Sequence, residues 1–245
     1  MGKRFIRKAA RGEARIHALY PEFIERDPAS SARQDHQPRY SRNIRPKGVH
    51  QAAFLDGLET SHLVIALGPA GTGKTYLAVA KAVEALEEGR VQRIVLCRPA
   101  VEAGESLGYL PGDIGAKLAP YLRPIYDVLT DRLGGKRLKA LLADDVIEIA
   151  PVAYMRGRTL NSSFIVIDEA QNCTFGQLKM LLTRLGWRST MVLTGDPDQS
   201  DLLPGLSGLS DIAERVERID TVAVVRMDAG DVVRHPLVAD MLSVL

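Results

Sequence analysis

A glycine-rich segment, Gly68–Thr75 (GPAGTGKT), carries the clearest chemical signal in the sequence. It lies directly between the apolar run HLVIAL and the helix-like run TYLAVAKAVEAL. Glycines let such a loop turn its backbone N–H groups inward around anionic oxygens, and the following helix adds the positive end of its dipole. Lys74 is then expected to reach the β- and γ-phosphates of a nucleotide, and the Thr75 hydroxyl to bind Mg²⁺. The segment predicts a phosphate site, with a glycine-rich turn that binds nothing as the alternative.

Two acids follow a second apolar run. The residues FIVI lead directly into Asp168 and Glu169. A carboxylate at the end of a buried strand beside the phosphate loop can hold the water shell of a magnesium ion, which we predict for Asp168. Glu169 can orient and deprotonate the attacking water. Many strands end in surface acids, so this prediction depends on the phosphate loop that precedes the pair.

A third polar group follows the apolar residues MVL. It contains Thr194, Gly195, Asp196 and Gln199. In an open α/β sheet, ligands bind beyond the carboxyl ends of the strands, so these residues are expected to face the same phosphate crevice. Gln199 is predicted to hydrogen-bond the attacking water or the γ-phosphate. An ordinary Gly-Asp-Pro turn is the alternative.

These residues need strands to position them, and the sequence supplies short, mostly continuous apolar runs. Such runs are typical of strands buried on both faces of a parallel sheet. They are predicted at Leu63–Leu67, Arg93–Cys97, Val146–Ala150, Phe164–Ile167, Thr190–Leu193 and Thr221–Val225. Helix-like segments alternate with them at Thr75–Glu88, Pro120–Leu133, Thr174–Leu185, Leu209–Val216 and from Pro236 onward. The alternation predicts an α/β fold with a mostly parallel sheet flanked by helices.

Composition is consistent with one sizeable globular domain. The chain has 245 residues, of which 46% are hydrophobic, and a net charge of +2. Residues 1–45 are basic and polar and are expected to form a partly disordered arm, whereas residues 46–245 are expected to form the domain. Cys97 and Cys173 lie in or next to apolar stretches and are predicted to be buried core thiols. With no apolar stretch long enough to span a membrane, the sequence indicates a reducing cytoplasm.

Taken together, six motifs closely resemble the PhoH-like ATPase family. They are GPAGTGKTYLAVAKAV, CRPAVEAGESLGYLPGDI, APVAYMRGRTL, FIVIDEAQN, LTGDPDQSDLLPG and DVVRHPL, and they span about residues 46–240. The family's core is similar to the first RecA-like domain of superfamily 1 helicases. The resemblance implies ATP hydrolysis with ATP and Mg²⁺ as cofactors, associated in some members with RNA binding or unwinding.

Matched by position, the resemblance assigns site residues. The nucleotide-binding set is Gly68, Pro69, Ala70, Gly71, Thr72, Gly73, Lys74, Thr75 and Tyr76, with Gln51 as the upstream glutamine that reads adenine by its amide. Asp168 becomes the magnesium-linked acid, Glu169 the catalytic base and Gln199 the γ-phosphate sensor. A lone glutamine such as Gln51 is usually only a surface residue, which is the alternative for that position.

Arginines are expected to complete the site from a neighbouring subunit. A superfamily 1 helicase uses a second RecA-like domain to bring an arginine to the γ-phosphate, and this chain has room for one domain. Head-to-tail packing of identical subunits closes into a ring when the rotation permits, and we expect a hexamer. Arg234 in DVVRHPL is the first candidate for an arginine supplied in trans, with Arg156 and Arg158 as runners-up. A surface or salt-bridged arginine is the alternative for each.

Single-stranded RNA or DNA is the expected partner. The segment Gly104–Asp131 interleaves Tyr109, Tyr121 and Tyr126 with basic residues, a pattern that could stack on a single strand but packs protein against protein at least as often. The basic arm could follow phosphates or simply be solvated. The leading hypothesis is an ATPase that remodels nucleic acid. The alternatives are a small-molecule kinase and a non-catalytic nucleotide-binding scaffold.

Overall fold

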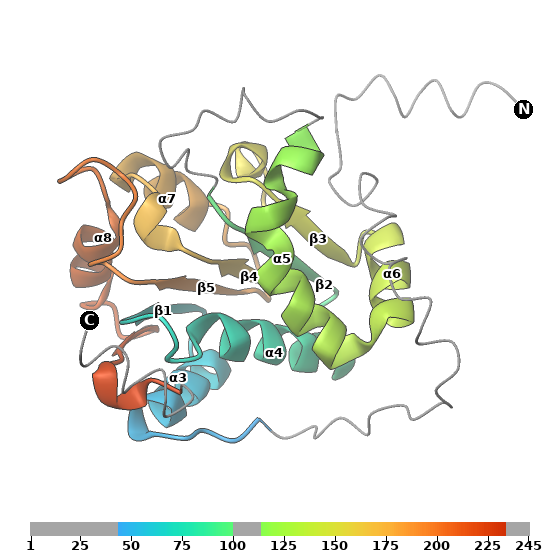
Figure 1. The fold of residues 1–245 in the computed structure, drawn as a ribbon, viewed down its shortest axis with the longest axis horizontal. Coiled ribbons are helices and arrows are strands. Elements are labelled where there is room, and N and C mark those ends of the chain that lie inside the picture. Colours follow the sequence, from blue (N-terminus) through green and yellow to red (C-terminus); the bar gives the residue numbers. More distant parts are fainter. Residues whose placement is uncertain (1–43, 100–113, 234–245) are drawn as a thin grey trace, which may run out of the picture.

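The centre of the molecule is a six-stranded sheet in the order β3-β2-β4-β5-β1-β6 (Figure 1). The structure, a computed structural model, describes residues 44–99 and 114–233. Its strands are β1 (Leu63–Leu67), β2 (Arg93–Cys97), β3 (Ile147–Ala150), β4 (Ser163–Ile167), β5 (Thr190–Gly195) and β6 (Val222–Arg226). All five pairings between neighbouring strands are parallel. The predicted parallel α/β sheet is therefore confirmed.

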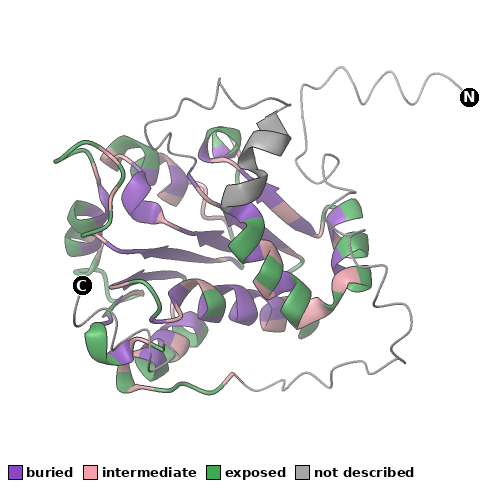
Figure 2. Cartoon of the chain, in the orientation of Figure 1, coloured by how far each residue is buried: buried purple, intermediate pink, exposed green. Residues whose placement is uncertain are grey.

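Helices cover both faces of this sheet. One face carries α3 (Val49–Thr60), α4 (Lys74–Glu87), α5 (Ile114–Leu133) and α6 (Gly135–Ala143), and the other carries α7 (Phe175–Leu182) and α8 (Leu209–Val216). In β1, Val64 and Ala66 pack on the first face and Ile65 on the second, and all three are fully buried. Figure 2 shows the buried strands between helices whose outer sides are exposed. This double burial explains why the strands lack polar alternation.

Several helices differ from the prediction. Helices α3 and α6 were not predicted; α6 buries only Leu138 and Leu142, which is too few apolar positions for a clear periodic signal. Helix α5 begins at Ile114, earlier than the predicted start at Pro120. Proline is a common first residue of a helix, but Pro120 lies inside this one. Helix α7 ends at Leu182, three residues early. The segment from Pro236 and most of the arm lie outside the described residues.

Ile44 and Arg45, the last residues of the predicted arm, lie on the domain. Ile44 packs against the core and Arg45 lines a pocket of about 660 Å³. Tyr126 in α5 is partly buried and also packs against the core, which favours the packing alternative for this tyrosine. The side chains of Tyr109 and Tyr121 lie outside the described residues.

The two cysteines are buried and free, as predicted. Burial raises the pKa of Cys97 well above its usual range and that of Cys173 to about 12. Both thiols therefore stay protonated and act as small apolar core residues. Within residues 44–99 and 114–233, no helix is long and apolar enough to cross a membrane.

Candidate nucleotide-binding site

The phosphate loop joins β1 to α4 through backbone conformations that require glycine. Gly68 has φ 138°, and a Cβ atom there would come within 2.3 Å of the Met227 carbonyl oxygen. Gly73, directly before α4, has φ 85°. Two neighbouring segments fix the loop: the Gly68 N–H donates to Gly195 O at 3.1 Å, and the Val233 N–H donates to Gly71 O at 2.9 Å. The loop is therefore held between β5 and the chain that follows β6.

Lys74 is the first residue of α4, and its ammonium group is turned into the loop. Its Nζ donates to Gly68 O at 2.6 Å, to Pro69 O at 2.8 Å and to Thr72 Oγ1 at 3.2 Å. The residue is 8% exposed. Burial lowers the pKa of Lys74, although the negative charges of nearby acids, Asp196 foremost, act in the opposite direction. A buried cation held by loop oxygens is suited to neutralise an anion that enters the loop.

Thr75 and Asp168 meet across the sheet edge and supply oxygen ligands of the kind that Mg²⁺ prefers. The Thr75 hydroxyl donates to Asp168 Oδ1 at 2.6 Å, and the Thr194 hydroxyl donates to the same oxygen at 2.8 Å. Asp168 and Thr194 are both almost fully buried. Thr194 thus orients the carboxylate that faces Thr75. This donor set fits the metal site predicted at Thr75 and Asp168.

Glu169 projects beside this pair from an unusual backbone conformation. It has φ 52° and ψ 43°, the left-handed region that a residue with a Cβ adopts at a cost of about 1–2 kcal/mol. The conformation ends β4 abruptly and starts the short 3₁₀ helix η5 (Ala170–Asn172). Glu169 Oε1 accepts from Arg98 Nη2 at 3.1 Å, and Oε2 accepts from Gln171 Nε2 at 2.5 Å. The predicted catalytic base is therefore held on both oxygens at the sheet edge.

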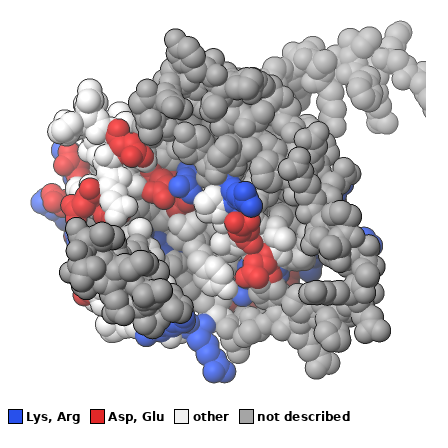
Figure 3. All heavy atoms as spheres, viewed as in Figure 1, with Lys and Arg blue, Asp and Glu red and all other residues white. Residues whose placement is uncertain are grey.

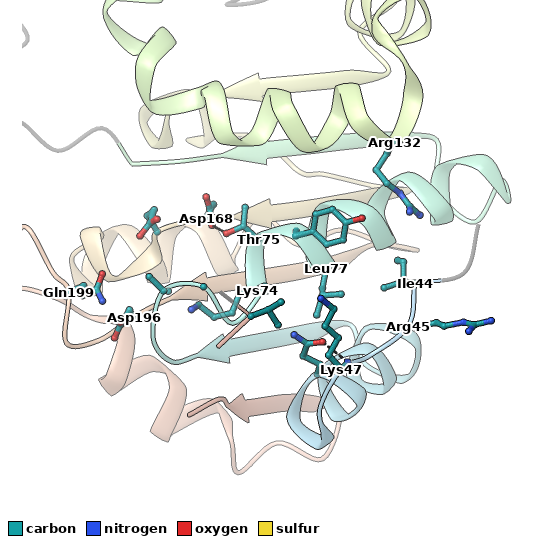
Figure 4. A pocket seen from close by; sticks show the side chains of 18 residues that line it. Ile44, Arg45, Lys47, Lys74, Thr75, Leu77, Arg132, Asp168, Asp196 and Gln199 are labelled. Carbon is teal, nitrogen blue, oxygen red and sulfur yellow. Dashed lines mark hydrogen bonds between the residues drawn. The ribbon is translucent and has the colours of Figure 1, made fainter. Parts of the chain in front are cut away.

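One pocket of about 660 Å³ contains most of these groups, and this volume suits a nucleotide. Figure 4 shows its labelled side chains, from Asp196 and Gln199 at one end, past Lys74 and Thr75, to Ile44 and Arg45 at the other. The lining is Ile44, Arg45, Lys47, Gln51, Ala70, Gly71, Gly73, Lys74, Thr75, Tyr76, Leu77, Arg132, Asp168, Glu169, Gly195, Asp196, Gln199 and Val233. The carboxyl ends of β1, β4 and β5 thus meet at a single cavity.

Most of the predicted site residues line this pocket, and a few do not. Gly68, Pro69 and Thr72 support the loop from behind through Lys74. Gln51 is 4% exposed: its Nε2 donates to Thr72 O at 2.9 Å, and its Oε1 accepts from the Lys47 N–H at 2.8 Å. Gln51 thus stabilises the loop, and its contact with adenine stays a prediction.

Of the candidate trans arginines, the structure describes Arg156 and Arg158. Arg158 forms a two-pronged pair with Glu148 of β3, with both N···O distances 2.6 Å, and Arg156 is exposed. Neither lines the pocket. Arg234 lies outside the described residues. The residue before it, Val233, is hydrogen-bonded to Gly71 of the phosphate loop. The turn that precedes Val233 is held to α3 by a 2.7 Å contact between His50 Nδ1 and Asp231 Oδ2.

Sequence reasoning missed several residues that the fold brings to the site. Arg98, Gln171 and Arg132 were given no role. Arg98 follows β2 directly, so the strand-end rule that identified Asp168 could have identified it too. Arg132 comes from α5 and reaches the pocket only through tertiary packing, for which the sequence holds no local signal (Figure 4).

A parallel sheet with a glycine loop, a lysine, a threonine and a strand-end acid around one cavity defines a RecA-like P-loop NTPase domain. Sequence comparison then gives the family. The family model described as PhoH-like protein matches residues 43–245, and the chain belongs to this family. The resemblance inferred from the six motifs is confirmed.

Two relatives show how far the similarity extends. A PhoH-like protein of Bacillus subtilis is 52% identical over 203 residues, which is 82% of this chain and 64% of that protein. A PhoH-like protein of Mycobacterium tuberculosis is 50% identical over 217 residues, which is 88% of this chain and 62% of that protein. The chain therefore spans less than two thirds of these two relatives. Among solved structures, the large terminase of a thermophilic bacteriophage aligns with a TM-score of 0.49 and 11% identity, over 81% of this chain and 50% of the terminase.

Proposed function

We propose that this domain works in the cytoplasm as a Mg²⁺-dependent ATPase. The observation that carries the proposal is the meeting of Lys74, Thr75, Asp168 and Glu169 at one pocket. The first three offer a cation for phosphates and oxygens for a metal. Glu169 adds a carboxylate that can take a proton from the attacking water. A kinase or a passive scaffold would not need this group, because neither activates water.

Each residue has a separate part in the proposed reaction. The Lys74 ammonium group gives up its hydrogen bonds to the loop oxygens and binds the phosphates instead. Thr75 and Asp168 would hold Mg²⁺, which when bound neutralises charge on the phosphate oxygens. Glu169 orients a water and accepts its proton. Gln199, exposed at the pocket rim, hydrogen-bonds that water or the γ-phosphate, and Gln51 contacts the adenine.

We further propose that hydrolysis is coupled to single-stranded nucleic acid, RNA in the first instance. The support is the family resemblance and the basic character of residues 1–45. On the face seen in Figure 3, acidic and basic side chains of the described residues are interspersed. The cation-rich surface required for phosphate contact is therefore expected from the arm rather than from this face.

The test is phosphate release from ATP by the purified full chain. We expect release that requires Mg²⁺, stops on chelation and rises with single-stranded RNA more than with a duplex of the same sequence. Absence of release with Mg²⁺ would contradict hydrolysis and favour the kinase or scaffold. Release that no single strand stimulates would contradict the coupling to nucleic acid but leave the ATPase standing.

We propose that identical subunits form a ring, a hexamer in our expectation, and that Arg234 acts on the neighbour's ATP. Val233 lies against its own phosphate loop, so an arginine acting within one subunit is the serious alternative. Mixing two inactive variants distinguishes them. In a ring with trans arginines, Arg234→Ala subunits mixed with Lys74→Met subunits create interfaces with both groups intact.

The mixture is expected to regain a fraction of wild-type turnover, of order one quarter if the subunits mix at random, because half of the sites keep Lys74 and half of the neighbours keep Arg234. Light scattering with and without ATP measures the assembly. A mixture that stays inactive, although both variants assemble, would place Arg234 in its own subunit's site. A monomer under all conditions would exclude the ring.

A further inference from the structure

Arg98 is a partly buried cation that contacts both Asp168 and Glu169, and it has no part in the reaction proposed above. It directly follows β2, whose last residue Cys97 is in register with Ile167 of β4. The Asp168 N–H donates to Cys97 O at 2.8 Å, so the two strand ends are joined. This pairing puts Arg98 beside Asp168 and Glu169 although some seventy residues separate them in sequence.

The guanidinium group bridges the two acids. Arg98 Nη1 lies 3.2 Å from Asp168 Oδ2, and Nη2 lies 3.1 Å from Glu169 Oε1. The side chain is 18% exposed, which removes much of the water that weakens surface ion pairs. Adjacent carboxylates repel each other, and a planar guanidinium fork suits a bridge between them better than a lysine does.

Arg98 approaches the acids from the side opposite the phosphate loop. Asp168 turns Oδ1 toward Thr75 and Thr194, and its other oxygen toward Arg98. Arg98 does not line the nucleotide pocket, whereas Asp168 and Glu169 do. This arrangement disfavours a direct contact with phosphate and leaves the carboxylates as the target of Arg98.

The Glu169 side chain depends on two hydrogen-bond partners, Arg98 and Gln171, for its orientation. That side chain is 35% exposed, and its backbone lies in the left-handed region. Gln171 holds Oε2 and is itself fixed: its Oε1 accepts from the Asp196 N–H at 3.2 Å, and its Nε2 also donates to Gln199 O at 3.3 Å. Arg98 and Gln171 therefore hold one oxygen each, and a carboxylate oxygen keeps a second lone pair for water.

We propose that Arg98 is a positioning residue that aims the Glu169 carboxylate at the attacking water. The inference rests on the proposed ATPase function and deepens it. Arg98 acts through Glu169, so its loss should slow the chemical step while ATP still binds. Two rival roles predict other outcomes: a phosphate contact should weaken binding, and a brake on Glu169 should speed turnover when removed.

The test compares kcat and ATP affinity for Arg98→Ala, Arg98→Lys and Arg98→Ala/Glu169→Gln in the full chain. We expect Arg98→Ala to lower kcat on the order of 10–100-fold, as misplacing a reacting group by about 1 Å does. ATP affinity, measured by titration with a fluorescent analogue, should change by less than about threefold. Lysine should restore part of kcat, because an ammonium can serve one of the two carboxylates.

The double variant isolates the route of the effect. Once Glu169→Gln has removed the base, adding Arg98→Ala should lower kcat by less than about a further threefold, since the effects of residues that act as a unit are non-additive. Arg93→Ala is the matched control: this arginine begins the same strand and bonds Ser163 Oγ at 2.9 Å, and its loss should leave kcat unchanged. Melting curves check that each variant folds.

The outcomes separate this inference from the function on which it rests. A wild-type chain that releases no phosphate contradicts the ATPase itself. If the wild type is active, then unchanged kcat in Arg98→Ala, faster turnover, a parallel loss of binding, or full additivity with Glu169→Gln would each overturn the positioning role.

Discussion

Replacing Lys74 by methionine is expected to lower turnover by about 10²–10³-fold and to weaken ATP binding as well. Methionine keeps most of the side-chain length but removes the charge. Asp168, Glu169 and Asp196 would then face the incoming phosphates without the buried cation that now lies among them. The lost charge would stabilise both the bound ATP and the transition state, so both the affinity for ATP and kcat should fall. Titration of the nucleotide and steady-state phosphate release measure the two effects.

The pH dependence of binding gives an independent check on Lys74. Burial lowers the pKa of this lysine, so its charge is lost at a pH below the ordinary 10.5. Wild-type ATP affinity should therefore decline with rising pH before that value, and the decline should be absent from Lys74→Met. An identical alkaline decline in the variant would assign the titration to another group.

Lys81 supplies the matched control, since it is a second buried lysine on α4. It is paired with Glu59 and Glu84 and does not line the pocket. Lys81→Met should cost stability while ATP affinity and turnover per folded molecule stay within about twofold, as for a change remote from the chemistry. If both lysine variants lose turnover equally, the effect of Lys74→Met reflects a damaged helix rather than a lost phosphate contact.

Glu169→Gln is expected to reduce turnover by about 10²–10⁴-fold and leave ATP binding nearly intact. Glutamine keeps the size of the side chain and can still accept a bond from Arg98, but its amide is a poor base. The metal pair Thr75 and Asp168 is untouched, so the bound state should persist and accumulate. Single-turnover phosphate release measures the chemical step, and nucleotide titration measures affinity.

The control for this change is Glu217→Gln at the end of α8. Like Glu169, Glu217 accepts from an arginine: its two oxygens lie 2.6 and 2.9 Å from Arg226, but it lies outside the pocket. Its loss should leave kcat within about twofold, since exposed ion pairs contribute little. Normal turnover in Glu169→Gln would show that another group, or bulk water, accepts the proton.

Much of the candidate site could be predicted from sequence because its parts lie at strand ends. Asp168 follows a run of buried apolar residues, and the phosphate loop combines glycines with Lys74 between a strand and a helix. These are local patterns, and the backbone rules behind them act over a few residues. The same rules predicted all six strands to within one or two residues.

What the sequence could not supply depends on which strands are neighbours. β2 and β4 lie side by side although β3 stands between them in the chain, and only this order puts Arg98 beside Glu169. The left-handed conformation of Glu169 has no sequence signal, because glycine or asparagine is the usual residue there. Gln51 could be proposed from its position, but its bond to Thr72 became visible only when α3 was seen against the loop.

Under the proposed function, the loop oxygens that Lys74 holds would compete with the phosphates of ATP for the same ammonium group. An arriving phosphate would displace Gly68 O and Pro69 O from the Lys74 ammonium group. When the product leaves, the ammonium group would bind these two oxygens again. The measured affinity is then the difference between two sets of bonds to one cation, smaller than either set alone. Under the proposed function, the affinity for ATP would therefore be lower than the phosphate contacts of Lys74 alone would give.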